Sequence, residues 1–107
     1  MTMTISDVQC SNNQYTVYDE NGQEVNRFWD SEGELAGFGQ DFLVFERNDH
    51  YRLVRADTGS EIASVWRDSV GRFKHANVDL AVFKRNDQVY THKVECSGLT
   101  EICSRWT

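Results

Sequence analysis

Apolar residues in this chain come in short runs that are separated by polar residues typical of turns. The clearest run covers residues 42–45 (FLVF), which suits a buried strand better than a helix. Asn48 and Asp49 follow it, and both residue types tolerate the positive φ of a tight turn. Residues 50–55 then alternate with the period of two of a half-exposed strand. This part of the pattern predicts a β-hairpin.

The pattern continues as short strands spaced at roughly 8–12 residues with a turn signal at each gap, which is typical of an all-β antiparallel meander. No stretch keeps a period of 3.6 residues with helix caps, so no long helix is expected. The predicted strands from residue 30 onward are residues 35–38, 42–45, 50–55 and 61–66, followed by 73–76, 80–83, 89–94 and 100–106.

The chain also repeats itself. Residues 30–49 align without a gap to residues 68–87, at a shift of 38 positions, and nine of the 20 positions are identical. Unrelated sequences would match at roughly one position in twenty, so the duplication is real and indicates a repeat architecture. The identical pairs are Asp30/Asp68, Ser31/Ser69, Gly33/Gly71, Asp41/Asp79, Val44/Val82, Phe45/Phe83, Arg47/Arg85, Asn48/Asn86 and Asp49/Asp87.

A third, weaker copy covers residues 12–29, which follow the pattern of residues 48–66. In each copy a Gly is followed by an acid, a β-branched residue and a Trp. The members are Gly22, Glu24, Val25 and Trp29; then Gly59, Glu61, Ile62 and Trp66; then Gly98, Glu101, Ile102 and Trp106. We therefore predict one all-β domain over residues 1–107, made of a front-truncated repeat (1–29) and two further repeats (30–66 and 67–107).

Four short strands in about 38 residues resemble the blade of a β-propeller. The resemblance is generic, since the Gly-His and Trp-Asp signatures of WD40 blades are absent. Propellers typically close with four to eight blades, more than this chain holds. Two alternatives follow. Either copies of the chain complete a ring, most simply as a two-fold homodimer with six blades, or the meander curls into a single small sandwich or barrel.

Composition indicates a folded domain of 107 residues, with 39% hydrophobic and 12% aromatic residues. No apolar run approaches the length that crosses a bilayer, and residues 1–9 lack the features of a secretory signal, so a cytoplasmic protein is expected. The three cysteines fit reduced thiols packed as small hydrophobes. A disulfide between Cys96 and Cys103, which flank a turn, stays open as an alternative.

Charge is unevenly distributed along the chain. There are 17 acids and 11 bases, for a net charge of −6, yet residues 67–107 carry seven bases and five acids. Such a net acidic domain is not attracted to nucleic acid or to anionic membranes, whereas a protein partner with a basic surface fits. The alternative is a solvated face that maintains solubility. The acids concentrate in one segment, where only Arg27 opposes them: Asp19, Glu20, Glu24, Asp30, Glu32, Glu34 and Asp41.

Motifs for catalysis or metal binding are absent from the sequence. There is no HExxH, GxSxG or phosphate-binding loop, and His50, His75 and His92 are far apart. Asp41 and Asp79 occupy equivalent repeat positions, where a carboxylate pair could serve acid–base chemistry but a turn-capping role is the usual one. We expect a protein that is not an enzyme and has no cofactor or metal.

The repeated tryptophans Trp29, Trp66 and Trp106 are the sharpest candidates for ligand binding. One aromatic per blade is how small multi-bladed lectins build sugar sites by stacking a ring on a sugar face. The alternative is that the rings close the edge of the core, because an aromatic side chain buries a large area. The residues predicted to form the core are Phe42, Val44, Phe45, Leu53, Val54, Ile62, Leu80, Val82, Phe83, Val94 and Ile102.

Two functional classes are consistent with these observations. The first is a small acidic inhibitor that occludes a basic partner surface, and the chain looks like the broad group of phage-encoded inhibitors of bacterial defence and bacterial toxin-immunity proteins. The second is an oligomeric repeat lectin that binds glycans through its tryptophans. Salt dependence separates them, since the electrostatic contact weakens in salt and ring stacking does not.

Overall fold

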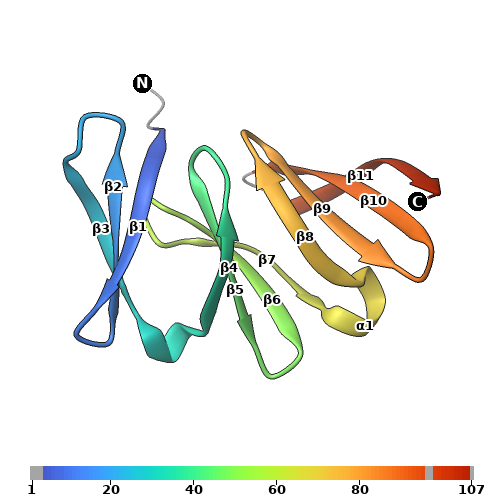
Figure 1. Ribbon diagram of the computed structural model, residues 1–107, viewed down its shortest axis with the longest axis horizontal. Coiled ribbons are helices and arrows are strands. Elements are labelled where there is room, and N and C mark those ends of the chain that lie inside the picture. The colour runs from blue at the N-terminus through green and yellow to red at the C-terminus, as the bar shows by residue number, and fades with distance from the viewer. Residues whose placement is uncertain (1–3, 96–97, 107) are drawn as a thin grey trace.

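The computed structural model describes residues 4–95 and 98–106, with Trp106 described by its backbone alone (Figure 1). It has three antiparallel sheets, each an up-and-down meander in which strands pair in chain order. The first sheet has three strands: β1 (Ile5–Ser11), β2 (Gln14–Asp19) and β3 (Glu24–Trp29). The second has β4 (Glu34–Phe38), β5 (Phe42–Arg47), β6 (His50–Arg55) and β7 (Glu61–Trp66). The third has β8 (Arg72–Asn77), β9 (Leu80–Arg85), β10 (Gln88–Glu95) and β11 (Gly98–Trp106).

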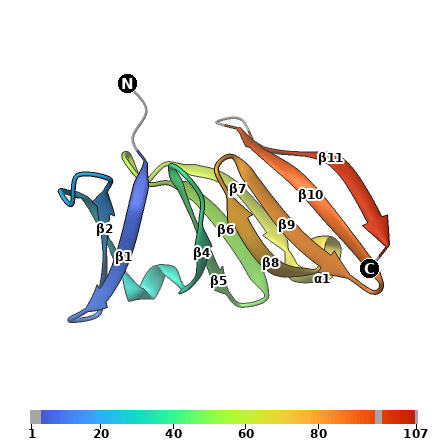
Figure 2. The same cartoon turned by 45° about the horizontal axis from the view of Figure 1, so that its top comes forward.

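The all-β fold class predicted from the sequence is confirmed. All eight strands predicted from residue 30 onward are present, most of them one or two residues longer than predicted. Two short helices join the sheets, η1 (Asp30–Glu32) and α1 (Arg67–Val70). The sheets stand next to one another in chain order as a sandwich-like stack (Figures 1 and 2), and the described strands close no barrel. None of the helices in the described part of the chain is long and apolar enough to cross a bilayer.

Three equivalent two-residue turns set the register of the sheets. Arg47 pairs with His50 and Arg85 pairs with Gln88, so the Asn48-Asp49 and Asn86-Asp87 turns have the same length, as the gapless repeat predicted. The first sheet has the same turn at residues 12–13. Asn48 and Asn86 have φ of 51° and 57°, within the left-handed region that Asn tolerates better than most residues.

The repeated Asp-Ser-x-Gly segments form the linkers between sheets. Arg47 donates a hydrogen bond of 2.8 Å to the carbonyl of Ser31, and Arg85 makes the equivalent bond of 2.7 Å to Ser69. Gly71 has φ of 93°, and a Cβ there would lie 2.4 Å from the carbonyl oxygen of Lys84. The close approach of the backbone at the glycine and the hydrogen bonds of the two arginines therefore explain why these residues are identical in the two repeats.

Two hydrophobic clusters hold the three sheets together. Phe45 lies at the centre of the first and contacts Tyr15 and Phe28 of the first sheet, with ring centroids 5.7 and 5.6 Å apart. Phe83 occupies the equivalent place in the second and contacts Tyr51 across the sheets at 5.5 Å. The buried members of the first cluster are Ile5, Val17, Phe28, Leu43, Phe45, Val54 and Ala56. Those of the second are Phe42, Val44, Tyr51, Leu53, Ala81, Phe83 and Val94.

The sequence-based core prediction is confirmed for eight residues and wrong for one. Ile102 is 53% exposed, while Ile62 and Leu80 are half-buried. Ile62 packs against the second cluster. Ile102 occupies the corresponding place in the third sheet, on a face that no further sheet covers. The confirmed residues are Phe42, Val44, Phe45, Leu53, Val54, Val82, Phe83 and Val94.

Polar bonds also cross from sheet to sheet. The hydroxyl of Tyr15 accepts the N–H of Leu35 at 3.3 Å, and that of Tyr51 accepts the N–H of Phe73 at 2.9 Å. In the third sheet Val89 takes the equivalent position. The tyrosine thus occurs only in the sheets that are followed by another within the described chain.

Candidate binding surfaces

The connections between strands gather at two opposite ends of the stack. The loop end carries the β2–β3, β4–β5, β6–β7 and β8–β9 connections, which lie along the upper edge in Figure 2, together with the end of β10 and the start of β11. The linker end carries the two-residue turns together with η1 and α1. Backbone bonds of 2.7 Å join the loop end, from the N–H of Ile5 to the carbonyl of Gln40 and from the N–H of Gln40 to that of Val78.

Acidic residues occur at every connection of the loop end. Glu20, Asp79 and Glu95 are exposed and Asp41 is half-buried, and these four make no ion pair with any other residue that the structure describes. Asp19, which ends β2, and Asp57, in the β6–β7 connection, also lie at this end, where Glu24 and Glu61 begin the following strands β3 and β7. The loop end therefore gathers acidic residues from four connections and from the end of β10.

The acidic residues predicted as a binding segment divide between the two ends. Asp19, Glu20 and Asp41 lie at the loop end, whereas Asp30, Glu32 and Glu34 lie at the linker end. A strand of six residues separates the ends by roughly 20 Å, so the structure does not bring the seven residues into one patch. The remaining member, Glu24, begins β3.

Several of these carboxylates already have partners within the chain. Asp19 accepts the N–H groups of Asn21 and Gln23 at 2.9 Å through one oxygen, which closes the β2–β3 turn. Glu24 pairs with Arg27 at 2.9 Å. Glu32 pairs with Arg52, a residue that also pairs with Glu61 at 3.0 Å. The hydrogen bond that Arg52 donates to Glu32 is the main cause of the raised pKa of Arg52.

Asp57 also has a partner at the loop end. Arg55 donates two hydrogen bonds of 3.1 Å to the Asp57 carboxylate, and these bonds are the main cause of the lowered pKa of Asp57. This acid is therefore less available to a partner than Glu20, Asp79 and Glu95.

The tryptophans do not close the core edge, so that alternative is wrong for the two that the structure describes. Trp29 and Trp66 are 60% and 55% exposed. Each is the last residue of the outer edge strand of its sheet, β3 or β7, beyond the cover of the neighbouring sheet. The Trp66 ring lies against His50, with centroids 3.6 Å apart. The side chain of Trp106 lies outside the described residues.

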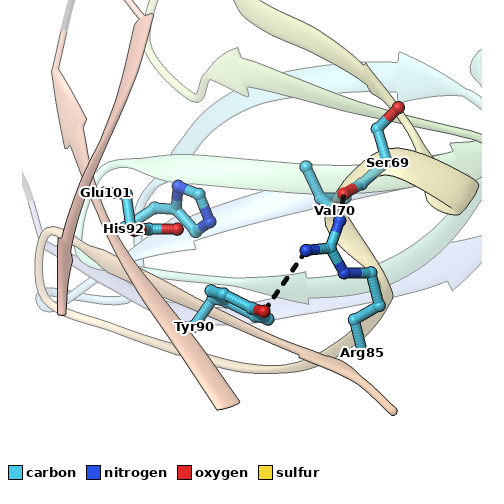
Figure 3. Close-up of a pocket in the computed structure, with 6 residues that line it drawn as sticks. All are labelled: Ser69, Val70, Arg85, Tyr90, His92 and Glu101. Atoms are coloured by element: carbon cyan, nitrogen blue, oxygen red, sulfur yellow. Dashed lines mark hydrogen bonds between the residues drawn. The ribbon is translucent and has the colours of Figure 1, made fainter. Parts of the chain in front are cut away.

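A small, partly open cavity of about 80 Å³ lies between α1 and the third sheet (Figure 3). His92 and Glu101 line one side of it, and Arg85 lines another and donates a hydrogen bond of 3.2 Å to the hydroxyl of Tyr90. Burial lowers the pKa of His92, and the charge of Glu101 acts in the opposite direction. The cavity has room for about two waters, far below the roughly 300–1,000 Å³ of a typical ligand pocket.

The other sequence candidates lie apart from one another. The carbonyls of Asp41 and Asp79 accept equivalent backbone bonds from Ala56 and Val94, at 2.9 and 2.7 Å. Their side chains make no such bond, so the repeated Asp serves these turns through its main chain. Cys10 and Cys103 are free and exposed, while Cys96 lies outside the described residues. Residues 4–95 and 98–106 hold no cluster of His, Cys, Asp and Glu suited to a metal ion.

Sequence reasoning missed the acidic loop end because its members are far apart in the chain. The repeated Asp41 and Asp79 were one available signal, since equivalent residues of stacked repeats lie at the same end. Asp57 and Glu95 are a second acidic pair at the same shift of 38 positions, but they lie beyond the aligned block of residues 30–49 and 68–87.

No protein-family model matches the chain, and no curated protein or solved structure shows significant similarity to it. The fold and surfaces define a class of protein only: an all-β repeat protein of three meander sheets with an acidic loop end and two exposed tryptophans.

Proposed function

We propose that this protein is a non-enzymatic protein-binding module, a small acidic inhibitor that occludes a basic surface of a partner, of the phage anti-defence or toxin-immunity type. The observation that carries the proposal is the loop end, where Glu20, Asp41, Asp79 and Glu95 lie without ion-pair partners among the described residues. The backbone bonds through Gln40 support these loops in a fixed arrangement.

The mechanism follows from charge. Carboxylates that converge on one side steer a Lys/Arg-rich surface toward it, which raises the association rate more than the final affinity. Each exposed pair contributes only ~0.2–1 kcal/mol, so several must act together. The proposal thus rests on the loop end as a whole, with Asp19, Glu20 and Asp41 as the members that the sequence also predicted.

The test compares two sets of three neutralising substitutions against a partner isolated from the source cell with the tagged protein. The first variant is Glu20→Gln with Asp41→Asn and Glu95→Gln at the loop end. The control is Asp30→Asn with Glu34→Gln and Asp68→Asn at the linker end, which removes the same net charge.

In stopped-flow measurements at low salt, the loop-end variant should associate several-fold more slowly than the control, and the two should converge at high salt. Equal rates for the two variants at both salt concentrations would show that the loop end does not direct binding.

A second candidate function is a lectin, because Trp29 and Trp66 are exposed at equivalent places. Their rings are accessible for stacking on a sugar face, as a glycan site requires. Binding to a glycan array that is independent of salt and lost in Trp29→Ala with Trp66→Ala would favour this function. Absence of glycan binding by the unmodified protein would remove it.

A further inference from the structure

Two clefts of the same design lie at the linker end, one where the first sheet joins the second and one where the second joins the third. The first has a volume of about 400 Å³ and the second about 510 Å³. Their linings share five equivalent positions: Asp30, Gly33, Glu34, Glu46 and Arg47 in the first, and Asp68, Gly71, Arg72, Lys84 and Arg85 in the second. Because of the duplication, the residues of the two clefts can be compared position by position.

The two clefts differ in the sign of their charge. Glu34 lies directly opposite Glu46 on the paired strands β4 and β5. At the equivalent place, Arg72 lies directly opposite Lys84 on β8 and β9. The supporting scaffold is the same in both, since Arg47 and Arg85 each bond the carbonyl of the preceding linker serine. The two clefts therefore share their supporting hydrogen bonds but differ in the charge of the facing side chains.

Glu46 of the acidic cleft has an ion-pair partner, whereas the two facing bases of the other cleft have none among the described residues. Arg67 of α1 pairs with Glu46 at 2.9 Å and also with Asp49. Arg72 and Lys84 are exposed and make no ion pair with the residues that the structure describes. Like charges directly opposite each other in a sheet are destabilising, and a bound anion would remove that repulsion.

We propose that the cleft formed by Arg72, Lys84 and Arg85 at the α1–β8 junction (Figure 1) binds a phosphate group of a small ligand. Arg72 and Lys84 supply charged N–H donors from neighbouring strands. Arg85 is held at the back of the cleft by its bond to Ser69. Asp68 lines the same cleft, and its negative charge opposes an anion there, so the three basic side chains must outweigh it. The volume admits a pyrophosphate with room to spare.

The test is a titration of the full chain with inorganic pyrophosphate at low ionic strength, followed by amide chemical shifts in NMR, with chloride at matched ionic strength as reference. The variant Arg72→Glu with Lys84→Glu places in the basic cleft the residue type that the acidic cleft holds at both positions. The control Lys74→Glu with Lys93→Glu makes the same change in net charge on the same sheet but outside the cleft lining.

Saturable shifts around residues 71–72 and 84–86 are expected in the unmodified protein, with affinity lowered at least tenfold in the cleft variant and no more than about threefold in the control. Should the cleft variant lose its far-UV dichroism, Arg72→Gln with Lys84→Gln replaces it. Shifts that chloride reproduces, or equal losses in cleft variant and control, would overturn the proposal.

Discussion

Tyr15 and Tyr51 show how a single side chain can join two sheets. Each ring packs in a core cluster while its hydroxyl accepts the N–H of the first strand of the following sheet, from Leu35 or Phe73. That N–H belongs to an edge strand, so it has no partner strand on its free side. The tyrosine therefore contributes packing and satisfies a polar group together.

Replacing Tyr51 by Phe should leave the N–H of Phe73 without its acceptor while keeping the ring. We expect the free energy of unfolding to fall by ~1–2 kcal/mol, measured by urea denaturation. Tyr18→Phe is the control, because the Tyr18 hydroxyl makes no hydrogen bond within the described part of the chain. Equal losses for the two variants would show that the Tyr51 hydroxyl does not join the sheets.

His92 makes stability depend on pH. Burial lowers the pKa of the folded His92 below its ordinary value of about 6.5. The unfolded chain then binds more protons in the window between the two pKa values, so stability is present above that window and lost as pH falls through it. The urea midpoint should fall less between pH 7.5 and 5.5 in His92→Gln than in the unmodified protein. The control His75→Gln, which replaces an exposed histidine, should show the same fall as the unmodified protein.

At the scale of elements, large aromatic residues are buried on the inner strands of a sheet and exposed at the end of its last strand. The inner strands β5 and β9 carry Phe45 and Phe83 into the clusters, whereas β7 ends on the exposed Trp66. A repeated aromatic residue therefore belongs to the core where a neighbouring sheet covers it, and to the surface where none does.

Trp66→Ala should accordingly cost ~1 kcal/mol or less, because more than half of the side chain stays in water. Phe83→Ala, which removes a fully buried ring, should cost ~3–5 kcal/mol. Urea denaturation of the two variants checks the contrast. A loss for Trp66→Ala as large as that for Phe83→Ala would place the Trp66 ring in the core after all.

At the scale of the whole molecule, the described residues leave the outer face of the first and of the third sheet uncovered. Among these residues the first sheet has no counterpart of β4 and β8, so β1 is an edge strand, whereas its equivalents β5 and β9 are paired on both sides. The outer face of the third sheet leaves Ile102 exposed. We propose that a second copy covers these surfaces in a two-fold dimer, with six sheets in a ring.

Light scattering at micromolar concentration should therefore give twice the chain mass of 12.4 kDa. Ile102→Asp, on the uncovered face, should shift the protein toward monomer while its secondary structure persists. A monomeric mass for the unmodified protein would indicate that the stack is complete as a single chain.

Local sequence was sufficient to place the strands and turns and to show that they repeat. Strands and turns depend on neighbouring residues, so Asn48, Asn86 and the apolar run before each were sufficient to place the hairpins. The identities between residues 30–49 and 68–87 revealed the duplication. Gly33 and Gly71 are among them because a Cβ at either position would lie too close to a backbone carbonyl oxygen.

The packing of the sheets, in contrast, establishes which faces are covered and which charges lie close together. Trp66 and Ile102 are apolar in the sequence but exposed in the fold, since coverage depends on whether another sheet lies alongside. The acidic loop end brings together residues up to 76 positions apart, from Asp19 to Glu95. The opposition of Arg72 to Lys84 depends on strand register. Burial and the proximity of charges depend on where residues lie in space. The sequence indicates them only where equivalent residues of the repeats show which positions lie together.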